Sequence, residues 1–135
     1  DSTEHISKIV LDPADKKVLY VSAPGPLFKA SKHRGLYKSI DAGKTWEKIL
    51  YINENTGCSD IAIHPTKSNI LFASTWEFRR KPFSFVSGGA GSALYKSNDG
   101  GKSWNKITKG LPEGNLGRIV IAVNPSKPSQ VLAIV

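Results

Sequence analysis

The sequence predicts an all-β chain built from repeated hairpins. Short runs of β-branched and aromatic residues alternate with Gly-, Pro- and Asp-containing turns, which is typical of hairpin strands. No stretch shows the 3.6-residue period of an amphipathic helix. Residues 35–49 recur, with few changes, at 93–107, which is 58 residues further on. Such self-similarity indicates a repeat architecture rather than one irregular domain.

A second hairpin unit occurs three times and alternates with the first. It covers residues 9–21, 61–73 and 119–134, each with a proline turn at its centre. Two hairpins form a four-stranded meander of roughly 55–60 residues, and a repeated meander of this size is a propeller blade. We therefore expect a β-propeller segment of about two and a half four-stranded antiparallel blades, with blade 1 at 5–52, blade 2 at 58–110 and half of blade 3 at 117–135.

The 15-residue repeat contains the motif Ser-x-Asp-x-Gly-x-Thr/Ser-Trp. Its Asp is placed to accept backbone N–H groups across a tight turn, and its Gly supplies the positive φ that the turn needs. Its Trp is expected to bury a large ring beneath the turn. Neither copy has the alternating oxygen ligands of a calcium loop, so we predict a structural role and no metal. The motif residues are Ser39, Asp41, Gly43, Thr45 and Trp46, then Ser97, Asp99, Gly101, Ser103 and Trp104.

These two motifs make the chain resemble the BNR/Asp-box repeat superfamily of β-propellers over essentially its whole length. That superfamily includes sialidases, xyloglucanase-type glycoside hydrolases and sortilin-like proteins. The flanking sequence most resembles sortilin-like and BNR-repeat glycosyl hydrolase-like proteins of secreted bacterial origin. The resemblance implies a propeller scaffold in a secreted, periplasmic or cell-surface bacterial protein.

Strand order predicts which loops are available for function. In a four-stranded meander the Pro turns and Asp-box turns share one end, so segments 24–34, 51–60, 76–92 and 109–118 lie at the other. We call this second end the loop face. Long, chemically mixed loops on a repeat scaffold are typical binding sites. Aromatic plates and guanidinium groups suit a glycan, and arginines also clamp carboxylates. The candidate ligand-binding residues are Arg34, Glu54, Asp60, Trp76, Glu77, Arg79, Arg80 and Arg118.

Structural alternatives stay open for several of these positions. Trp76 directly continues a strand, so it is also a candidate for core or inter-blade packing. Phe83 and Phe85 alternate in a way that would fold their loop onto the body as a lid. The run 79–81 is equally a solvated charge cluster. His64 stands where the sister units have Asp12 and Asn124, which indicates turn chemistry before proline rather than a metal ligand.

The amino-acid composition limits the classes of partner and chemistry expected of this chain. The formal net charge is +8, but most lysines are spread singly through turns and strand edges, so we expect no nucleic-acid partner. No run of 18 apolar residues occurs, so we expect no membrane insertion. The one cysteine, Cys58, gives no disulfide framework and has no evident His partner for nucleophilic catalysis. We expect no cofactor.

The sequence leaves the enzyme question open. A glycoside hydrolase needs two carboxyl groups about 5–9.5 Å apart, and no spacing identifies a pair among Glu54, Asp60, Glu77 and Glu113. The arginine triad, Tyr–Glu nucleophile and Phe/Tyr-Arg-Ile-Pro motif of sialidases have no counterparts here. The first hypothesis is an exported binding or assembly scaffold for a glycan or protein, and the alternative is a fragment of a BNR-type glycoside hydrolase. Because propellers close with about 4–8 blades, we also expect further blades of a parent chain, or self-association through open edges.

Overall fold

The computed structural model describes residues 3–135, and those residues form strands and turns. No helix in this part of the chain is long and apolar enough to cross a membrane. The eleven strands are β1 (Lys8–Leu11), β2 (Leu19–Ala23), β3 (Gly35–Ser39), β4 (Glu47–Leu50), β5 (Thr56–Ile63), β6 (Leu71–Lys81), β7 (Ser84–Ser87), β8 (Ala93–Ser97), β9 (Asn105–Ile107), β10 (Val120–Val123) and β11 (Val131–Ile134).

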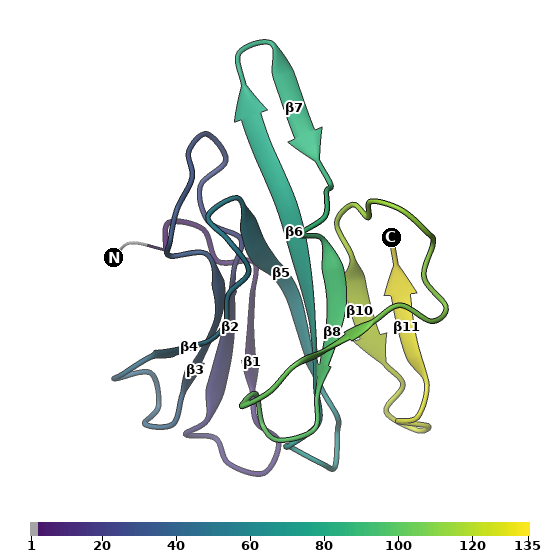
Figure 1. Cartoon of the computed structure of the whole chain (residues 1–135). Coiled ribbons are helices and arrows are strands. Elements are labelled where there is room, and N and C mark those ends of the chain that lie inside the picture. The colour runs from purple at the N-terminus through teal and green to yellow at the C-terminus, as the bar shows by residue number, and fades with distance from the viewer. Residues whose placement is uncertain (1–2) are drawn as a thin grey trace.

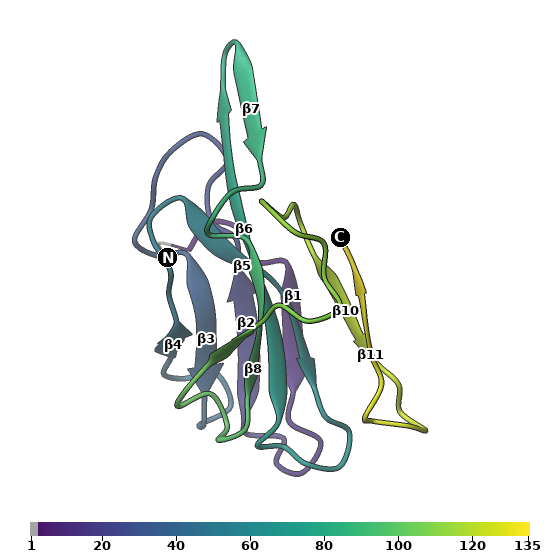
Figure 2. The ribbon, with the colours of Figure 1, turned by 45° about the vertical axis from the view of Figure 1, so that its right-hand side comes forward.

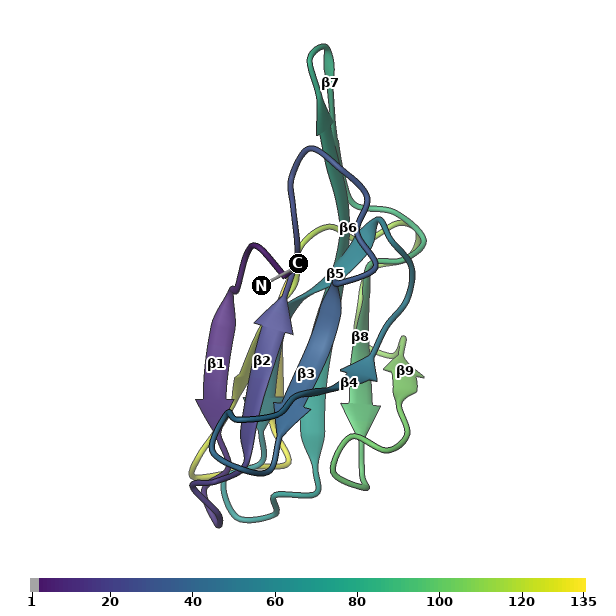
Figure 3. The same cartoon turned by 90° about the vertical axis from the view of Figure 1, so that its left-hand side faces the viewer.

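The strands form three antiparallel sheets. The first is the meander β1-β2-β3-β4, which faces the viewer in Figure 3. The second has the order β5-β6-β8-β9, with β7 added to the far end of β6, and the third is the hairpin β10-β11. The expected all-β propeller segment is confirmed, since two four-stranded meanders are followed by the first hairpin of another. We call the three sheets the first, second and third blades.

The blades stack side by side on apolar faces (Figures 1 and 2). The strand β5 contacts β1, β2 and β3 on one side and β10 on the other. Between the first and second blades lies a core that includes Tyr20, Leu36, Ile61 and Leu71. A second core joins Phe72, Leu94, Leu116, Ile119 and Ile121 between the second and third blades. Each sheet therefore buries its apolar side chains against the next sheet, as repeat architectures do.

The two Asp-box turns have the same internal geometry. In the first, the Thr45 hydroxyl donates to Asp41 Oδ2 (2.6 Å), and the amide of Gly43 donates to Ser39 Oγ (2.8 Å). The φ angle is +61° at Ala42 and +87° at Gly43. The hydrogen bonds from Thr45, followed by that from Ser39, lower the pKa of Asp41 to about 2. The carboxylate is therefore ionised and fully used inside its own turn, which supports the structural role predicted for it.

The second box repeats this arrangement. The Ser103 amide donates to Asp99 Oδ1 (2.9 Å), the Gly101 amide donates to Ser97 Oγ (2.9 Å), and Gly101 has a φ of +93°. Hydrogen bonds from Ser103 lower the pKa of Asp99 below its usual range.

The two Asp-box tryptophans differ in their surroundings. Trp104 packs against the core of the first blade and donates its indole N–H to the carbonyl of Ile49 (2.9 Å). The expectation that both rings are buried is wrong for Trp46, which is 43% exposed. The reason is that an Asp-box ring is covered by the neighbouring blade on that side. Trp104 has such a neighbour in the first blade, and Trp46 has none among residues 3–135.

This difference gives a matched pair of substitutions. Trp104→Ala is expected to lower the free energy of unfolding by about 2–3 kcal/mol, because it removes inter-blade apolar contact and one hydrogen bond. Trp46→Ala is expected to cost about 1 kcal/mol or less, since much of that ring already meets water. Urea unfolding followed by circular dichroism measures both. Equal losses for the two variants would contradict the stacking described above.

The three proline turns also match one another. The residue before proline accepts a hydrogen bond from the amide two positions later: Asp12 Oδ1 from Ala14 (2.8 Å), His64 Nδ1 from Thr66 (3.3 Å) and Asn124 Oδ1 from Ser126 (3.0 Å). The interpretation of His64 as a turn residue is therefore confirmed, because the imidazole nitrogen takes the place of the Asp or Asn oxygen.

Candidate functional site

The loop face lies at the end of the sheets opposite the Asp-box turns (Figures 1 and 3). The structure differs there from the sequence prediction in two places. Segment 76–92 is not an irregular loop, because β6 continues to Lys81 and pairs with β7. The expectation that Phe83 and Phe85 form a lid on the body is wrong: the β6–β7 hairpin projects away, and Phe83 is fully exposed. Asp60 lies inside β5 rather than in a loop.

Arg34 belongs to the framework of the loop face. Its side chain is 0% exposed, so it is not placed to meet a ligand as the sequence suggested. The guanidinium donates to the carbonyls of Pro24, Pro26 and Lys29, and lies 4.5 Å from the centre of the Phe78 ring. Burial, with a further contribution from Arg79, lowers its pKa to about 10, so it stays charged at neutral pH. Arg34 therefore fixes the loop between β2 and β3.

Asp60 is a second framework residue. One carboxylate oxygen accepts the amide of Ile61 (2.8 Å) and pairs with Lys8 Nζ (2.8 Å), and the other accepts the amide of Ile121 (2.8 Å). Lys8 lies on β1 and Ile121 on β10. A single buried carboxylate thus connects the first strands of all three blades. With its acceptor sites engaged in this way, Asp60 is a poor candidate for ligand binding.

Glu77 and Arg79 hold neighbouring segments in place. Glu77 Oε2 accepts the amide of Gly91 (2.9 Å). Arg79 donates to the side chain of Asn55 (2.8 Å) and to the carbonyl of Phe28 (3.3 Å). By contrast, Glu54 and Arg80 are exposed, and neither lies beside Trp76 in a shared pocket.

A recess of about 250 Å³ brings two of the predicted residues, Trp76 and Arg118, together on the loop face. The Arg118 guanidinium lies 5.7 Å from the centre of the Trp76 ring. On the strand β6, the Trp76 ring also stacks on Phe78, with ring centres 4.2 Å apart and planes 20° from parallel. We call this the mouth recess. Its lining consists of His5, Pro24, Gly25, Leu27, Ser59, Trp76, Phe78 and Arg118.

Local backbone features shape the mouth recess. Gly57, opposite Trp76 on β5, has no side chain because a Cβ there would lie 2.1 Å from the carbonyl oxygen of Pro24. The loop between β2 and β3 can therefore lie directly on β5. The register of β5 shifts between Cys58 and Asp60, and this irregularity leaves Ser59 at the recess, where its hydroxyl bonds to Ser74 Oγ (2.8 Å).

The chemistry of the mouth recess is aromatic and cationic. Trp76 Nε1 is buried and has no hydrogen-bond partner within the described chain. The ring of Trp76, rather than its buried N–H, is the part that lines the recess. Arg118 is exposed and free to contribute further donors. No carboxyl group lines the recess.

The sequence did not identify His5, Leu27, Ser59 or Phe78 as recess residues. Phe78 was accessible to sequence reasoning, because it follows Trp76 by two positions and so shares its face if β6 continues. The other three reach the recess only through the packing of the first blade on the second.

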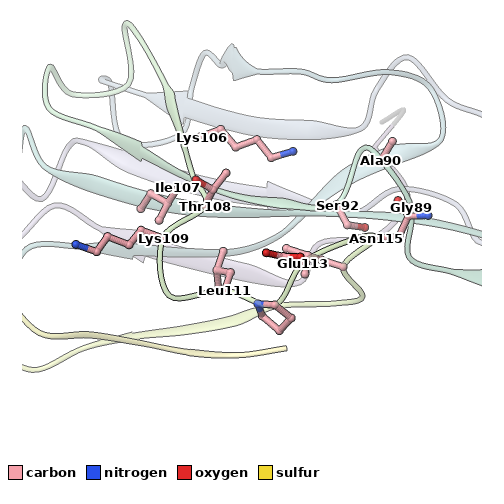
Figure 4. A pocket seen from close by; sticks show the side chains of 13 residues that line it. Gly89, Ala90, Ser92, Lys106, Ile107, Thr108, Lys109, Leu111, Glu113 and Asn115 are labelled. Atoms are coloured by element: carbon pink, nitrogen blue, oxygen red, sulfur yellow. The ribbon is translucent and has the colours of Figure 1, made fainter.

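A larger hollow of about 690 Å³ lies at the outer hairpin of the second blade (Figure 4). Ile107 and Lys106, from β9, form one wall, and Leu111 and Glu113 come from the segment that follows. Ile107 is the repeat equivalent of Ile49, onto which Trp104 packs in the first blade. This hollow therefore has the character of a blade-packing surface, and the mouth recess is the better candidate for a ligand.

Two other kinds of chemistry find no support in the described residues. Burial raises the pKa of the Cys58 thiol to about 12, so it is protonated and shielded at neutral pH. Residues 3–135 contain no cluster of three or more His, Cys, Asp or Glu side chains arranged to hold a metal ion.

Stacked four-stranded antiparallel meanders with equivalent turns define a β-propeller segment. No family model matches the chain. Its sequence is 27% identical over 107 residues to a vacuolar protein sorting/targeting protein 10 from Colletotrichum graminicola, covering 78% of this chain. It is 30% identical over 118 residues to a xyloglucanase from a Paenibacillus species, covering 81% of this chain. These matches support the predicted resemblance to sortilin-like and xyloglucanase-type β-propeller proteins.

A solved structure gives the same fold. The crystal structure of the GH74 xyloglucanase from Xanthomonas campestris superposes on 95% of this chain with a TM-score of 0.63 and 23% sequence identity. The chain spans only 6% and 11% of the two sequence relatives and 18% of that crystallised chain. The matches therefore concern the propeller scaffold.

Proposed function

We propose that this propeller segment is a binding scaffold and that the mouth recess holds a glycan. The observation that carries the proposal is the Trp76 indole: its ring forms part of a concave wall, it stacks on Phe78, and Arg118 lies beside it. An aromatic face stacks on the apolar face of a sugar ring, and an exposed guanidinium donates to sugar oxygens. The resemblance to a xyloglucanase makes plant β-glucans suitable first probes.

The test is titration with xyloglucan oligosaccharides, read out by calorimetry and by tryptophan fluorescence. Trp76→Ala is expected to weaken binding at least tenfold, because it removes the stacking surface. Arg118→Gln is expected to weaken it by about threefold to tenfold. Trp46→Ala is the matched control, since that exposed tryptophan lies on the opposite, Asp-box end.

The control variant also gives a result that would contradict binding at Trp76. An equal loss of affinity in Trp46→Ala and Trp76→Ala would place the binding elsewhere. Absence of binding to any member of a broad glycan panel, with binding to a protein or peptide at Trp76 instead, would replace the glycan with a protein ligand.

A second candidate function is a fragment of a glycoside hydrolase, favoured by the xyloglucanase relative. Hydrolysis needs two carboxyl groups across the bond that is cut. The mouth recess has none, and Asp60 and Glu77 are engaged with backbone amides. Glu4, Glu54 and Glu113 are exposed carboxylates on the loop face, and Glu4 and Glu54 line one hollow with Lys29. Release of reducing ends from xyloglucan that disappears in Glu54→Gln would favour the hydrolase over the scaffold.

We further propose that the protein is exported to the cell surface, periplasm or medium, where such glycans occur. Further blades, from the same polypeptide or a second copy, would cover the surface around Trp46 and the hollow beside Ile107. Trp46 is the repeat equivalent of Trp104, and Ile107 is the repeat equivalent of Ile49. Each site therefore carries one half of the Trp104–Ile49 contact that joins the first and second blades.

A further inference from the structure

The hairpin formed by residues 78–87 projects beyond the rest of the loop face, and we call it the arm (Figures 1 and 3). Its two strands pair through the register Phe78↔Ser87, Arg79↔Val86, Arg80↔Phe85 and Lys81↔Ser84. The first blade has no counterpart, because its equivalent segment is the loop fixed by Arg34. The arm is therefore an addition to the repeat that blade packing does not require.

One edge of the arm is closed and the other is open. On the β6 side, the amide of Phe78 donates to the carbonyl of Asn55 (3.2 Å), and that of Arg80 donates to the carbonyl of Leu27 (3.0 Å). Phe78 and Arg80 thus direct their amides away from β7. In an antiparallel pair their partners, Ser87 and Phe85, likewise direct their own N–H and C=O groups outward.

Nothing in the described chain pairs with that outward edge. Within residues 3–135, β7 bonds to β6 and no other segment donates to or accepts from the backbone of Phe85 or Ser87. Natural edge strands are commonly protected by charged side chains, proline or a bulge. The β7 sequence Ser-Phe-Val-Ser has none of these, and all four residues are exposed. An unprotected edge of this kind is a template for strand addition.

The positive charge of the arm favours an acidic partner strand over a basic one. Arg79, Arg80 and Lys81 lie on β6, one strand away from the free edge of β7, and the sequence from 78 to 98 contains no Asp or Glu. Two arms of this chain would bring six positive charges together, so pairing with a second copy is disfavoured by repulsion. An acidic strand would instead place its carboxylates toward Arg80, whose guanidinium lies 5.8 Å from the centre of the Phe85 ring, and toward the exposed Lys81. The exposed Phe83 at the tip adds an apolar contact.

We propose that the arm is a docking strand, on which an extended acidic segment of a partner protein adds to the free edge of β7. The backbone of Phe85 and Ser87 supplies the main-chain hydrogen bonds, and the basic residues of β6 supply the preference for acidic sequences. Because the β6 edge already bonds to the carbonyls of Asn55 and Leu27, a partner strand adds to the arm at the β7 edge. The free edge at Phe85 and Ser87 lies outside the mouth recess, whose lining includes only Phe78 at the base of the arm, and its test uses a peptide rather than a glycan.

The probe is a short peptide of alternating Glu and Val, blocked at both ends and carrying a fluorophore for anisotropy. The wild-type chain is expected to bind it, with affinity that falls as salt rises, and to bind the matching Lys/Val peptide at least tenfold more weakly. Phe85→Pro removes one outward N–H without touching the bonds to β6, and is expected to weaken binding at least tenfold. Phe85→Ala keeps that N–H and is expected to change affinity by about threefold at most.

A modified peptide removes any dependence on how the variants fold. Methylating every second amide blocks one hydrogen-bonding edge of an extended peptide, so one of the two alternating methylation patterns should abolish binding and the other should preserve it. Equal binding of both patterns would overturn the proposal. So would binding to anionic phosphatidylserine vesicles that depends on Phe83 and is unaffected by Phe85→Pro, since that would make the arm a membrane contact. Concentration-dependent dimers lost in Phe85→Pro, without peptide binding, would assign the edge to a second copy.

Discussion

Replacement of Asp60 by alanine is expected to lower the free energy of unfolding by about 2–4 kcal/mol. The buried carboxylate accepts the amides of Ile61 and Ile121, and an unsatisfied buried N–H costs about 1–3 kcal/mol. The ion pair with Lys8 adds less, because the Lys8 side chain is 41% exposed and an ion pair in contact with water is weak. Urea unfolding at neutral pH measures the loss.

Amide hydrogen exchange locates the effect. In Asp60→Ala the amide of Ile121 should exchange markedly faster than in the wild type, because its acceptor is gone and the third blade is less firmly attached. Lys8→Met is the control and should cost less than about 1 kcal/mol. A wild-type exchange rate at Ile121 in Asp60→Ala would show that the carboxylate does not connect the blades.

Arg34→Ala is expected to destabilise the chain by about 3–5 kcal/mol. The substitution leaves the carbonyls of Pro24, Pro26 and Lys29 without their donor, and it removes the contact with Phe78. Since small domains have about 5–15 kcal/mol in all, the variant approaches the limit of stable folding.

Arg34→Lys tests the geometry of this contact. A lysine keeps the charge, but its single ammonium lacks the planar fork that reaches several carbonyls at once. We expect a loss about half that of Arg34→Ala. If lysine restored wild-type stability, the charge rather than the fork would be what holds the loop.

The sequence predicted the repeated hairpins and both sets of turns because their information is local. The Asp41 and Asp99 turns close on bonds spanning two to four residues, so the motif alone determines them. The proline turns at Asp12, His64 and Asn124 are local in the same sense. Meander order then placed the loop face without any tertiary information.

Local sequence patterns do not predict that Arg34 and Asp60 are buried residues of the framework. Arg34 directly precedes β3 and Asp60 follows Ser59 in the sequence, and exposure is the ordinary expectation for such charged residues. Asp60 is buried because β1 and β10 close over it from two other blades, a contact spanning 61 residues to Ile121. Arg34 is buried because the loop that precedes it folds back over its side chain. Neither kind of burial produces a periodic pattern or a motif in the sequence.

The arm was missed for a reason of turn chemistry. Hairpins with two-residue loops usually show Asn-Gly or a similar pair, because their turns need positive φ. Here the turn is Pro82-Phe83, and neither residue has positive φ. The basic run 79–81 also interrupts the alternation of apolar and polar residues, so the sequence does not predict that β6 continues to Lys81.

Two arginines on the loop face separate framework residues from binding residues. Arg34 belongs to the buried framework, and Arg118 belongs to the exposed wall of the mouth recess. Urea unfolding of Arg34→Ala and Arg118→Ala, measured side by side with the wild type, is predicted to show a loss of about 3–5 kcal/mol for the first and less than about 1 kcal/mol for the second. Equal losses, or a larger loss for Arg118→Ala, would contradict this division between framework and binding residues.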